Sequence, residues 1–308
     1  MIPFVTEYEA RYGELEQLTP RIRRVLAENP SKFTFKGTGT YLVGDRRVAV
    51  IDPGPDLASH REALARAVDG LEVTHILVTH CHADHVPLTS WLQEATGAPT
   101  YAFGPHVDLH PEVPPPERAT EEAVDLSFAP DVVVADGGTI AGDGWTLEAV
   151  HTPGHTGNHL CFAFAEERAL FSGDHVMGWS TTIVGPPGGD VRDYLGSLQT
   201  LLDRDDAVLW PTHGPPIRDP QPFLQAYRRH RLDREQQVLA CLAGGDQEVP
   251  AIVARLYADV RPELHQPAGW AVLGHLVKLV EDGTVRVDGE GPPRIDARFS
   301  LVRPRAVR

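Results

Sequence analysis

Cysteine is scarce in this chain, and long apolar runs are missing from it. The three cysteines, Cys81, Cys161 and Cys241, are far apart and odd in number, which argues against a disulfide framework and favours a reducing, cytoplasmic location. No run of 18 apolar residues occurs, so we expect no transmembrane helix and no membrane partner. Residues 1–10 have neither the basic region nor the apolar core of a secretory signal.

Basic residues are also in short supply. The chain has 28 Lys and Arg against 43 Asp and Glu, for a net charge of −15. The imbalance is confined to one part: residues 1–219 carry 32 acidic and 15 basic residues, hence −17, whereas residues 220–308 carry 11 and 13, hence +2. The acidic part repels a phosphodiester backbone at long range, which counts against a nucleic-acid substrate.

Apolar residues, glycine and proline are plentiful. Of the 308 residues, 42% are hydrophobic, 28 are Gly and 27 are Pro. These proportions predict a substantial core with many turns and exclude a disordered chain.

Strand and helix patterns alternate along residues 38–210. Two β-rich runs over 38–51 flank Gly44-Asp45 and predict a hairpin. Residues 57–69 have helical spacing, and 73–79 form an apolar, β-branched run typical of a strand buried on both faces. Further strands are predicted at 101–103, 160–164, 169–171 and 208–210, several antiparallel strands at 132–150, and a helix at 193–202. This order predicts an α/β fold with strands enclosed between surface helices.

A proline-rich loop interrupts this pattern. Residues 104–118 contain five prolines. Either the segment is a flap near a functional site or it is an ordinary surface excursion.

The pattern changes after His213. Helical segments are predicted at 220–242, 251–257 and 270–282, followed by a hairpin over 283–302 around Gly289-Glu290-Gly291. Three helices and a hairpin are the layout of a small winged-helix-like α+β unit.

The strongest chemical signal follows the predicted strand 73–79. His80, His82, Asp84 and His85 lie within six residues. Imidazole nitrogen and carboxylate oxygen both suit zinc, and a loop that leaves a strand end directs alternate side chains inward. A His-rich surface loop is the alternative, but it does not require this spacing.

Three later segments supply partners for this loop. Each is a strand-like run that ends in Gly or Pro turn chemistry beside one potential ligand: His155, Asp174 and His213. The seven side chains together predict a metal site.

This set of motifs resembles the metallo-β-lactamase superfamily over residues 38–214, because HxHxDH is followed by a His, an Asp and a His at successive strand ends. The resemblance implies an αββα sandwich with the metals at one sheet edge. It also implies two zinc ions: His80, His82 and His155 on the first, Asp84, His85 and His213 on the second, and Asp174 bridging them.

A finer resemblance extends over most of the chain. Residues 37–43, 171–174, 211–216 and 228–237 look like the β-lactamase-like protein 2 group, which has a C-terminal winged-helix domain and includes an endonuclease acting on single-stranded RNA. The expected domains are therefore a metal-binding catalytic domain at 1–219 and a winged-helix-like domain at 220–308. An iron redox variant of the superfamily is disfavoured, because His85 is present and no flavin domain is visible.

Two zinc ions at such a site imply hydrolysis by a shared hydroxide without a covalent intermediate. Asp84 and Asp174 are the catalytic candidates that orient this nucleophile. Three functions compete: hydrolysis of a small carbonyl compound such as an ester, thioester, lactone or β-lactam; cleavage of single-stranded RNA; and a non-enzymatic binding module with a structural zinc. The third is disfavoured, because structural zinc prefers closed Cys/His sites with four ligands.

Several neighbours of the ligands have two possible roles. Asp52 either hydrogen-bonds a ligand His or caps a turn, and residues 179–182 either line the pocket or form a plain turn. Two sets of side chains are expected to be structural: His151, His159 and His175 by hydrogen bonding or packing, and Cys81 in the core. The cluster Arg228, Arg229, Arg231 and Arg234 is expected on a solvated helix face paired with Asp233 and Glu235, with phosphate contact as the alternative.

Overall fold

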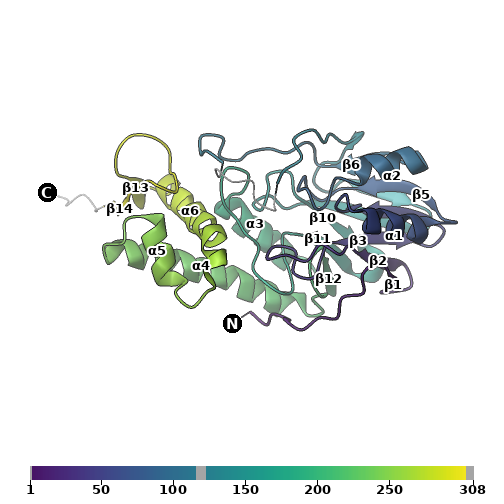
Figure 1. Cartoon of the computed structure of the whole chain (residues 1–308), viewed down its shortest axis with the longest axis horizontal. Helices are drawn as coiled ribbons and strands as arrows, with labels where there is room; N and C mark the ends of the chain where they lie inside the picture. Colours follow the sequence, from purple (N-terminus) through teal and green to yellow (C-terminus); the bar gives the residue numbers. More distant parts are fainter. Residues whose placement is uncertain (1, 116–122, 303–308) are drawn as a thin grey trace.

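The computed structural model describes residues 2–115 and 123–302. Two β-sheets form the centre of its larger part, on the right in Figure 1. The larger sheet has seven strands in sequence order: β1 (Leu15–Gln17), β2 (Ile22–Leu26), β3 (Gly39–Gly44), β4 (Arg47–Ile51), β5 (Glu72–Leu77), β6 (Thr100–Ala102) and β7 (Val132–Val133). The smaller sheet has the order β12 (Val208–Pro211), β11 (Ala169–Gly173), β10 (Leu160–Phe164), β9 (Trp145–His151) and β8 (Thr139–Gly142).

The alternation of side chains along each strand explains why the two sheets stack. On β3, Tyr41 and Val43 face the smaller sheet, whereas Leu42 faces the opposite layer. Phe162 and Phe171 of the smaller sheet meet the first pair in one buried cluster. Burial of these aromatic and branched side chains contributes the main driving force that holds the sheets together.

Helices cover both outer faces. On the larger sheet, α1 (Ala58–Val68) and α2 (Thr89–Thr96) bury Leu64 and Leu92 against Leu42. On the smaller sheet, α3 (Val191–Leu202) and the first half of α4 (Pro220–Ala243) pack Tyr194 and Tyr227 against strand residues such as Cys161. The layers are therefore αββα, as the sequence predicts.

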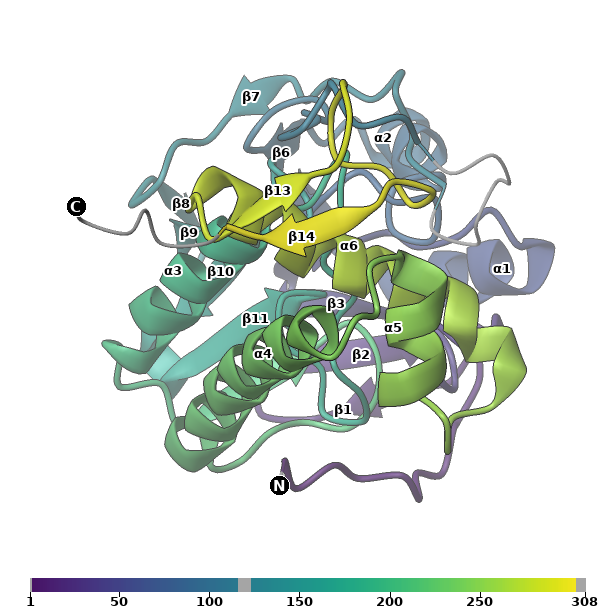
Figure 2. The same cartoon turned by 90° about the vertical axis from the view of Figure 1, so that its left-hand side faces the viewer.

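A third helical group lies at the end of the molecule opposite α1 and α2 (Figures 1 and 2). It comprises the end of α4, α5 (Val249–Leu256), α6 (His265–Glu281) and the hairpin of β13 (Val285–Val287) and β14 (Phe299–Leu301). These elements share one core that includes Ile252, Leu276 and Phe299. Helix α6 also contacts α3, so this group packs against the sandwich beside the β11–α3 connection.

Most predicted elements are present, with some differences. The strands β1 and β2 and the helix α2 have no counterpart among the predicted segments. Strand β7 pairs in parallel with β6 in the larger sheet, whereas an antiparallel strand was expected there, because a two-residue strand carries too little pattern to show its partner. Helix α6 begins at His265, before the predicted start at Trp270.

Residues 104–115 of the proline-rich loop are described by the structure, and residues 116–118 lie outside the described residues.

The predicted domain boundary at residue 219 coincides with the residue before α4 but stays a prediction. Among the described helices, none has the length and apolar character required to cross a membrane.

Candidate metal centre

All seven predicted ligands lie where strands of the two sheets end at one edge of the sandwich. His80, His82, Asp84 and His85 follow β5 on a single loop, and His155 follows β9. Asp174 directly follows β11, and His213 follows β12. Because β4 and β5 are parallel to each other, as are β11 and β12, their carboxyl ends meet at this edge, and ligands distant in sequence become neighbours.

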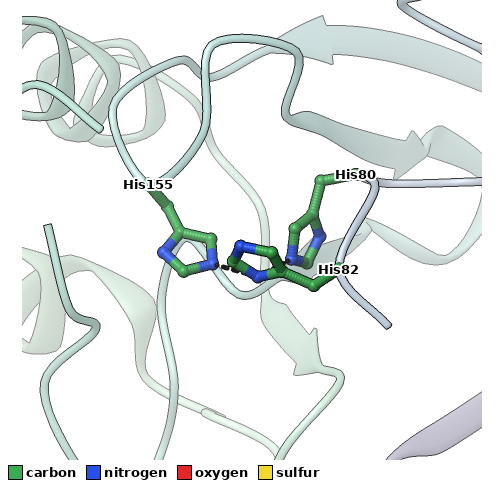
Figure 3. A group of neighbouring side chains, drawn as sticks. All are labelled: His80, His82 and His155. Atoms are coloured by element: carbon green, nitrogen blue, oxygen red, sulfur yellow. Dashed lines mark hydrogen bonds between the residues drawn. The ribbon is translucent and has the colours of Figure 1, made fainter. Parts of the chain in front are cut away.

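The first group of ligands is His80, His82 and His155 (Figure 3). Nδ1 of His82 lies 2.9 Å from Nε2 of His80 and 3.2 Å from Nε2 of His155. Around a tetrahedral zinc with bonds of 2.0–2.1 Å, ligand atoms are separated by roughly 3.3 Å. Three ring nitrogens at this spacing therefore fit one such ion.

The second group is Asp84, His85 and His213. Nε2 of His213 lies 3.1 Å from Oδ2 of Asp84, and Nε2 of His85 lies 3.5 Å from Oδ1 of the same carboxylate. These contacts define a second set of converging donor atoms beside the first.

Asp174 lies between the two groups. Its Oδ2 atom is 3.2 Å from His213, 3.6 Å from His85 and 4.0 Å from His155, in each case from Nε2. One carboxylate oxygen thus faces ligands of both groups, which is the position that a bridging ligand requires. The groups coincide with the predicted division of ligands, and the role of each residue stays a prediction.

Two observations test whether the site suits metal ions. Nε2 of His85 and Oδ1 of Asp174 are buried without a hydrogen-bond partner, although such an orphaned atom normally costs free energy. Burial also lowers the pKa of His80, His82 and His155, so these imidazoles are neutral and their lone pairs are free to coordinate. The donor set of nitrogen and carboxylate oxygen therefore fits zinc or a similar cation.

The second group attracts positive charge by itself. Burial disfavours a charged His213, yet the carboxylates of Asp174 and Asp84 outweigh burial and raise its pKa to about 10. The pKa of His85 is likewise raised well above its ordinary value, since Asp84, Asp174 and Asp52 outweigh its burial. In turn the two imidazoles hold the pKa of Asp174 well below its ordinary value against the effect of burial. This local excess of negative charge is what a divalent cation would neutralise.

Hydrogen bonds to the second ring nitrogen fix the orientation of three ligand imidazoles. Nδ1 of His155 donates to the carbonyl of Ile183 at 2.9 Å, and Nδ1 of His213 donates to the carbonyl of Gly37 at 3.1 Å. Nδ1 of His85 faces Asp52 Oδ2 at 2.8 Å. With Nδ1 occupied in this way, Nε2 is the atom left for a metal.

Asp52 is therefore a support for a ligand rather than a simple turn cap. Its backbone is in the left-handed region, with φ +50°, and its carboxylate also accepts from the backbone N–H and the hydroxyl of Thr79, both at 2.8 Å. These bonds join the end of β4 to the start of the ligand loop. A strained backbone that aims a buried carboxylate in this way is typical of a functional site.

The other neighbours of the ligands have structural contacts. His159 Nε2 accepts from the backbone N–H of Asp174 at 3.2 Å, whereas His151 stacks on Phe103 with ring centroids 3.8 Å apart. His175 is buried, and neither ring nitrogen has a partner among the described residues. Cys81 is buried in a small apolar cluster with its Sγ facing Asn158, as expected for a core cysteine.

A cavity of about 190 Å³ opens beside His155 and Asp174. Residues 179–182 line it, so this segment is more than a plain turn. A second cavity beside His82 and His155 is lined in part by His106, Asp108 and Pro115, so the described part of the proline-rich loop lies next to the predicted metal ligands.

Two features of the site were not predicted from the sequence, although they involve residues in segments that were singled out there. Thr38 donates its hydroxyl to Asp84 Oδ2 at 2.9 Å. The sequence offered one signal for this role of Thr38, namely its position at the start of the predicted run 38–51. The C-terminal helices also line the first cavity, through residues of α4 and α6.

The predicted basic cluster on α4 divides into two faces. Arg228 and Arg229 are exposed, as expected. Arg231 is buried, so a solvated position is wrong for this residue. The helix face that contains Arg231 turns toward the sandwich. The sequence of α4 does not indicate this face, because polar residues occur all around the helix.

The comparisons with known proteins agree with this geometry. The family model described as Metallo-beta-lactamase superfamily matches residues 34–213, and the model described as Beta-lactamase associated winged helix domain matches residues 249–292. The chain is 34% identical to an atrochrysone carboxyl ACP thioesterase of Aspergillus chevalieri, covering 90% of this chain and 87% of that protein. It is 31% identical to a beta-lactamase-like protein 2 homolog of Caenorhabditis elegans, covering 88% of each.

A solved structure agrees over the same extent. A metallo-beta-lactamase family protein of Thermus thermophilus superposes with a TM-score of 0.73 and 25% identity, covering 93% of this chain and all of that one. With its two matched family models, its αββα layers and its converging His and Asp ligands, the chain belongs to the metallo-beta-lactamase superfamily and is a hydrolase of that superfamily.

Proposed function

We propose that this enzyme is a dinuclear zinc hydrolase that cleaves a small carbonyl substrate, with a thioester as the first choice. The observation that carries the proposal is the position of Asp174 Oδ2 within 3.2–4.0 Å of ligand nitrogens from both groups. When bound, zinc ions lower the pKa of a water molecule to near neutrality and polarise an oxygen of the substrate.

The side chains of the chain hold and orient the reacting groups. Asp84 is hydrogen-bonded to Thr38 and His213, and Asp174 is held through its backbone by His159 and Thr182. Both carboxylates are thus fixed before substrate arrives, which is the kind of preorganisation that lowers an activation barrier. Because their pKa values are lowered, both carboxylates are ionised at neutral pH and are able to accept a hydrogen bond from water.

The choice of a thioester rests on similarity and on charge. A relative that is 34% identical over 90% of this chain is named as an acyl-carrier-protein thioesterase. The net charge of −17 over residues 1–219 disfavours a polyanionic substrate at this edge of the sandwich. The cavity beside the ligands also presents apolar side chains, including Met177 and Ile183, to an acyl chain.

Cleavage of single-stranded RNA is the second candidate. The match to a winged helix domain over residues 249–292 supports it, because helix-turn-helix units commonly bind nucleic acids. The positive net charge of residues 220–308 points in the same direction.

One set of assays separates the two candidates. The purified enzyme is loaded with zinc and assayed against thioesters, lactones, β-lactams and short single-stranded RNAs, with and without a chelator. We expect thioester hydrolysis that the chelator abolishes and that Asp84→Ala removes, whereas the exposed hairpin variant Asp45→Asn retains it. Cleavage of RNA alone would establish the second candidate, and activity that survives chelation would contradict a metal-dependent mechanism.

A further inference from the structure

The cavity next to Asp174 and His155 has a basic wall formed by the C-terminal helices. Residues Arg231 and Arg234 of α4 line it together with His275 of α6. The predicted ligands Asp174 and His155 and this basic wall thus line the same cavity.

Arg231 is buried without a charged partner. The residue is only 3% exposed, and its guanidinium lies 4.9 Å from the centre of the Tyr194 ring. Nη2 donates to the carbonyl oxygen of Thr182, but Nε has no partner. Among the described residues, no carboxylate lies within ion-pair distance of this guanidinium. An unpaired buried charge is costly, so a complementary anion is expected to fill the cavity.

Arg234 and His275 extend the same wall. Arg234 stacks over Tyr257 at 4.4 Å, and its Nε has no partner. His275 is fully buried, and neither ring nitrogen has a hydrogen-bond partner. Stacked guanidinium groups with free N–H donors are well suited to bind carboxylate or phosphate oxygens.

Glu235, which follows Arg234 on α4 and faces His275, is already paired with a lysine. Glu235 lies 4.0 Å from Nδ1 of His275, beyond hydrogen-bond distance. Its carboxylate pairs with Lys278 at 2.9 Å, and that lysine also pairs with Asp282. Glu235 therefore does not offset the charge of the two arginines.

Thr182 connects the basic wall to the metal ligands. Its hydroxyl donates to the carbonyl oxygen of Asp174 at 2.7 Å, and its own carbonyl accepts from Arg231. The next residue, Ile183, accepts from Nδ1 of His155. One short segment thus connects Arg231 to His155 of the first ligand group and to Asp174, which lies between the groups.

We propose that Arg231, Arg234 and His275 form an oxyanion subsite, which binds a carboxylate or phosphate of the substrate while the scissile bond lies at the metal-binding residues. The inference rests on the proposed hydrolase function and specifies its substrate as an acidic one. The oxyanion comes either from the acyl part, as a carboxylate, or from the thiol part, as the phosphate of a phosphopantetheine.

Three thioesters distinguish these sources. Butyryl-N-acetylcysteamine is uncharged, glutaryl-N-acetylcysteamine carries an acyl carboxylate, and butyryl-phosphopantetheine carries a phosphate on the thiol side. For Arg234→Gln we expect kcat/KM on one charged thioester to fall roughly 10- to 100-fold more than on the uncharged one, as for the loss of a charged hydrogen bond. Arg228→Gln, on the exposed face of the same helix, is the matched control and should change the three values equally. An equal loss on all three substrates with Arg234→Gln would overturn the subsite.

A binding measurement separates this inference from the hydrolase proposal. Calorimetry measures the affinity of inorganic phosphate and of glutarate for the full chain, zinc-loaded and after chelation. We expect at least one of the two anions to bind both forms, and Arg234→Gln to weaken that binding about tenfold or more, with Arg231→Lys as a second variant that keeps the charge but loses the planar fork. Binding of neither anion, or binding that is identical in wild type and Arg234→Gln, would overturn the inference even if thioesters are hydrolysed.

Discussion

Nδ1 of His85 lies 2.8 Å from Oδ2 of Asp52, and both side chains are almost completely buried. Asp52 directly follows β4, and its backbone is in the left-handed region. The contact therefore links the end of β4 to the predicted ligand loop. It leaves Nε2 of His85 directed at Asp84 and Asp174, so the geometry of the second ligand group depends on a residue that binds no metal itself.

Replacing Asp52 with Asn should weaken metal binding. The amide that replaces one carboxylate oxygen cannot accept from all of the donors around Asp52, so His85 loses its fixed orientation. We expect zinc affinity to fall roughly 10- to 100-fold, measured by competition with a chromophoric chelator. Asp45→Asn on the exposed hairpin turn is the control, and unchanged affinity in Asp52→Asn would contradict a supporting role.

Removing His213 should separate the two ligand groups. The variant His213→Gln leaves the converging nitrogens of His80, His82 and His155 intact. We therefore expect one tightly bound metal ion per chain in place of two, by elemental analysis of the folded variant. Retention of two ions would show that His213 is not a ligand, whereas loss of both would show that the groups are not independent.

Gly154 should tolerate no side chain. Its φ is +129°, and a Cβ atom would lie 2.4 Å from backbone atoms of Tyr194 in α3, so Gly154→Ala strains the loop that carries His155. We expect a loss of about 1–3 kcal/mol in the free energy of unfolding, measured by chemical denaturation. Gly196→Ala, on the exposed face of the same helix with open space around it, should instead stabilise by about 0.5–1 kcal/mol. Equal effects at the two glycines would contradict this account.

The contact between His110 and Asp190 should make stability depend on pH. Nε2 of His110 lies 2.7 Å from Asp190 Oδ2, and this hydrogen bond, opposed by burial and aided by the charges of Asp190, Glu281 and Glu112, raises the His110 pKa above its ordinary 6.5. The pKa of Asp190 is lowered from 3.8, because hydrogen bonds from His110 and from the start of α3 outweigh burial.

A group whose pKa is raised by folding stabilises the fold below its ordinary pKa, and this contribution is lost as pH rises through the raised value. For Asp190 the sign is opposite, since its contribution is present above 3.8 and is lost as pH falls. Wild type should therefore exceed His110→Gln in stability most between about pH 4 and 6.5, and the difference should shrink toward pH 9. Thermal melts of both proteins at each pH measure this difference. A difference that is independent of pH would contradict a charged His110.

The sequence alone predicts much of the metal edge, because four predicted ligands are closely spaced after one strand and each of the three later ones follows a strand-like run beside Gly or Pro. His80 to His85 and the three later ligands could be placed in this way without coordinates. Strands enclosed between surface helices likewise follow from strand runs that alternate with amphipathic helices, as at 73–79 and α1, whereas the αββα order of the layers was implied by the family resemblance.

Other features depend on tertiary packing and have no local signal. The strands β1 and β2 were not predicted, since Arg23 and Arg24 occupy the middle of β2 and hide its apolar face. The burial of Arg231 was likewise not predictable from α4, where polar residues surround the helix. Only the packing of α4 and α6 against the Thr182 segment turns this arginine toward the cavity.

Anomalous diffraction from a zinc-loaded crystal tests most directly whether two metal ions share Asp174. We expect two zinc peaks about 3.5–4 Å apart, one against the nitrogens of His80, His82 and His155 and the other against Asp84, His85 and His213, with Asp174 contacting both. A single peak, or two peaks of which Asp174 contacts only one, would contradict it.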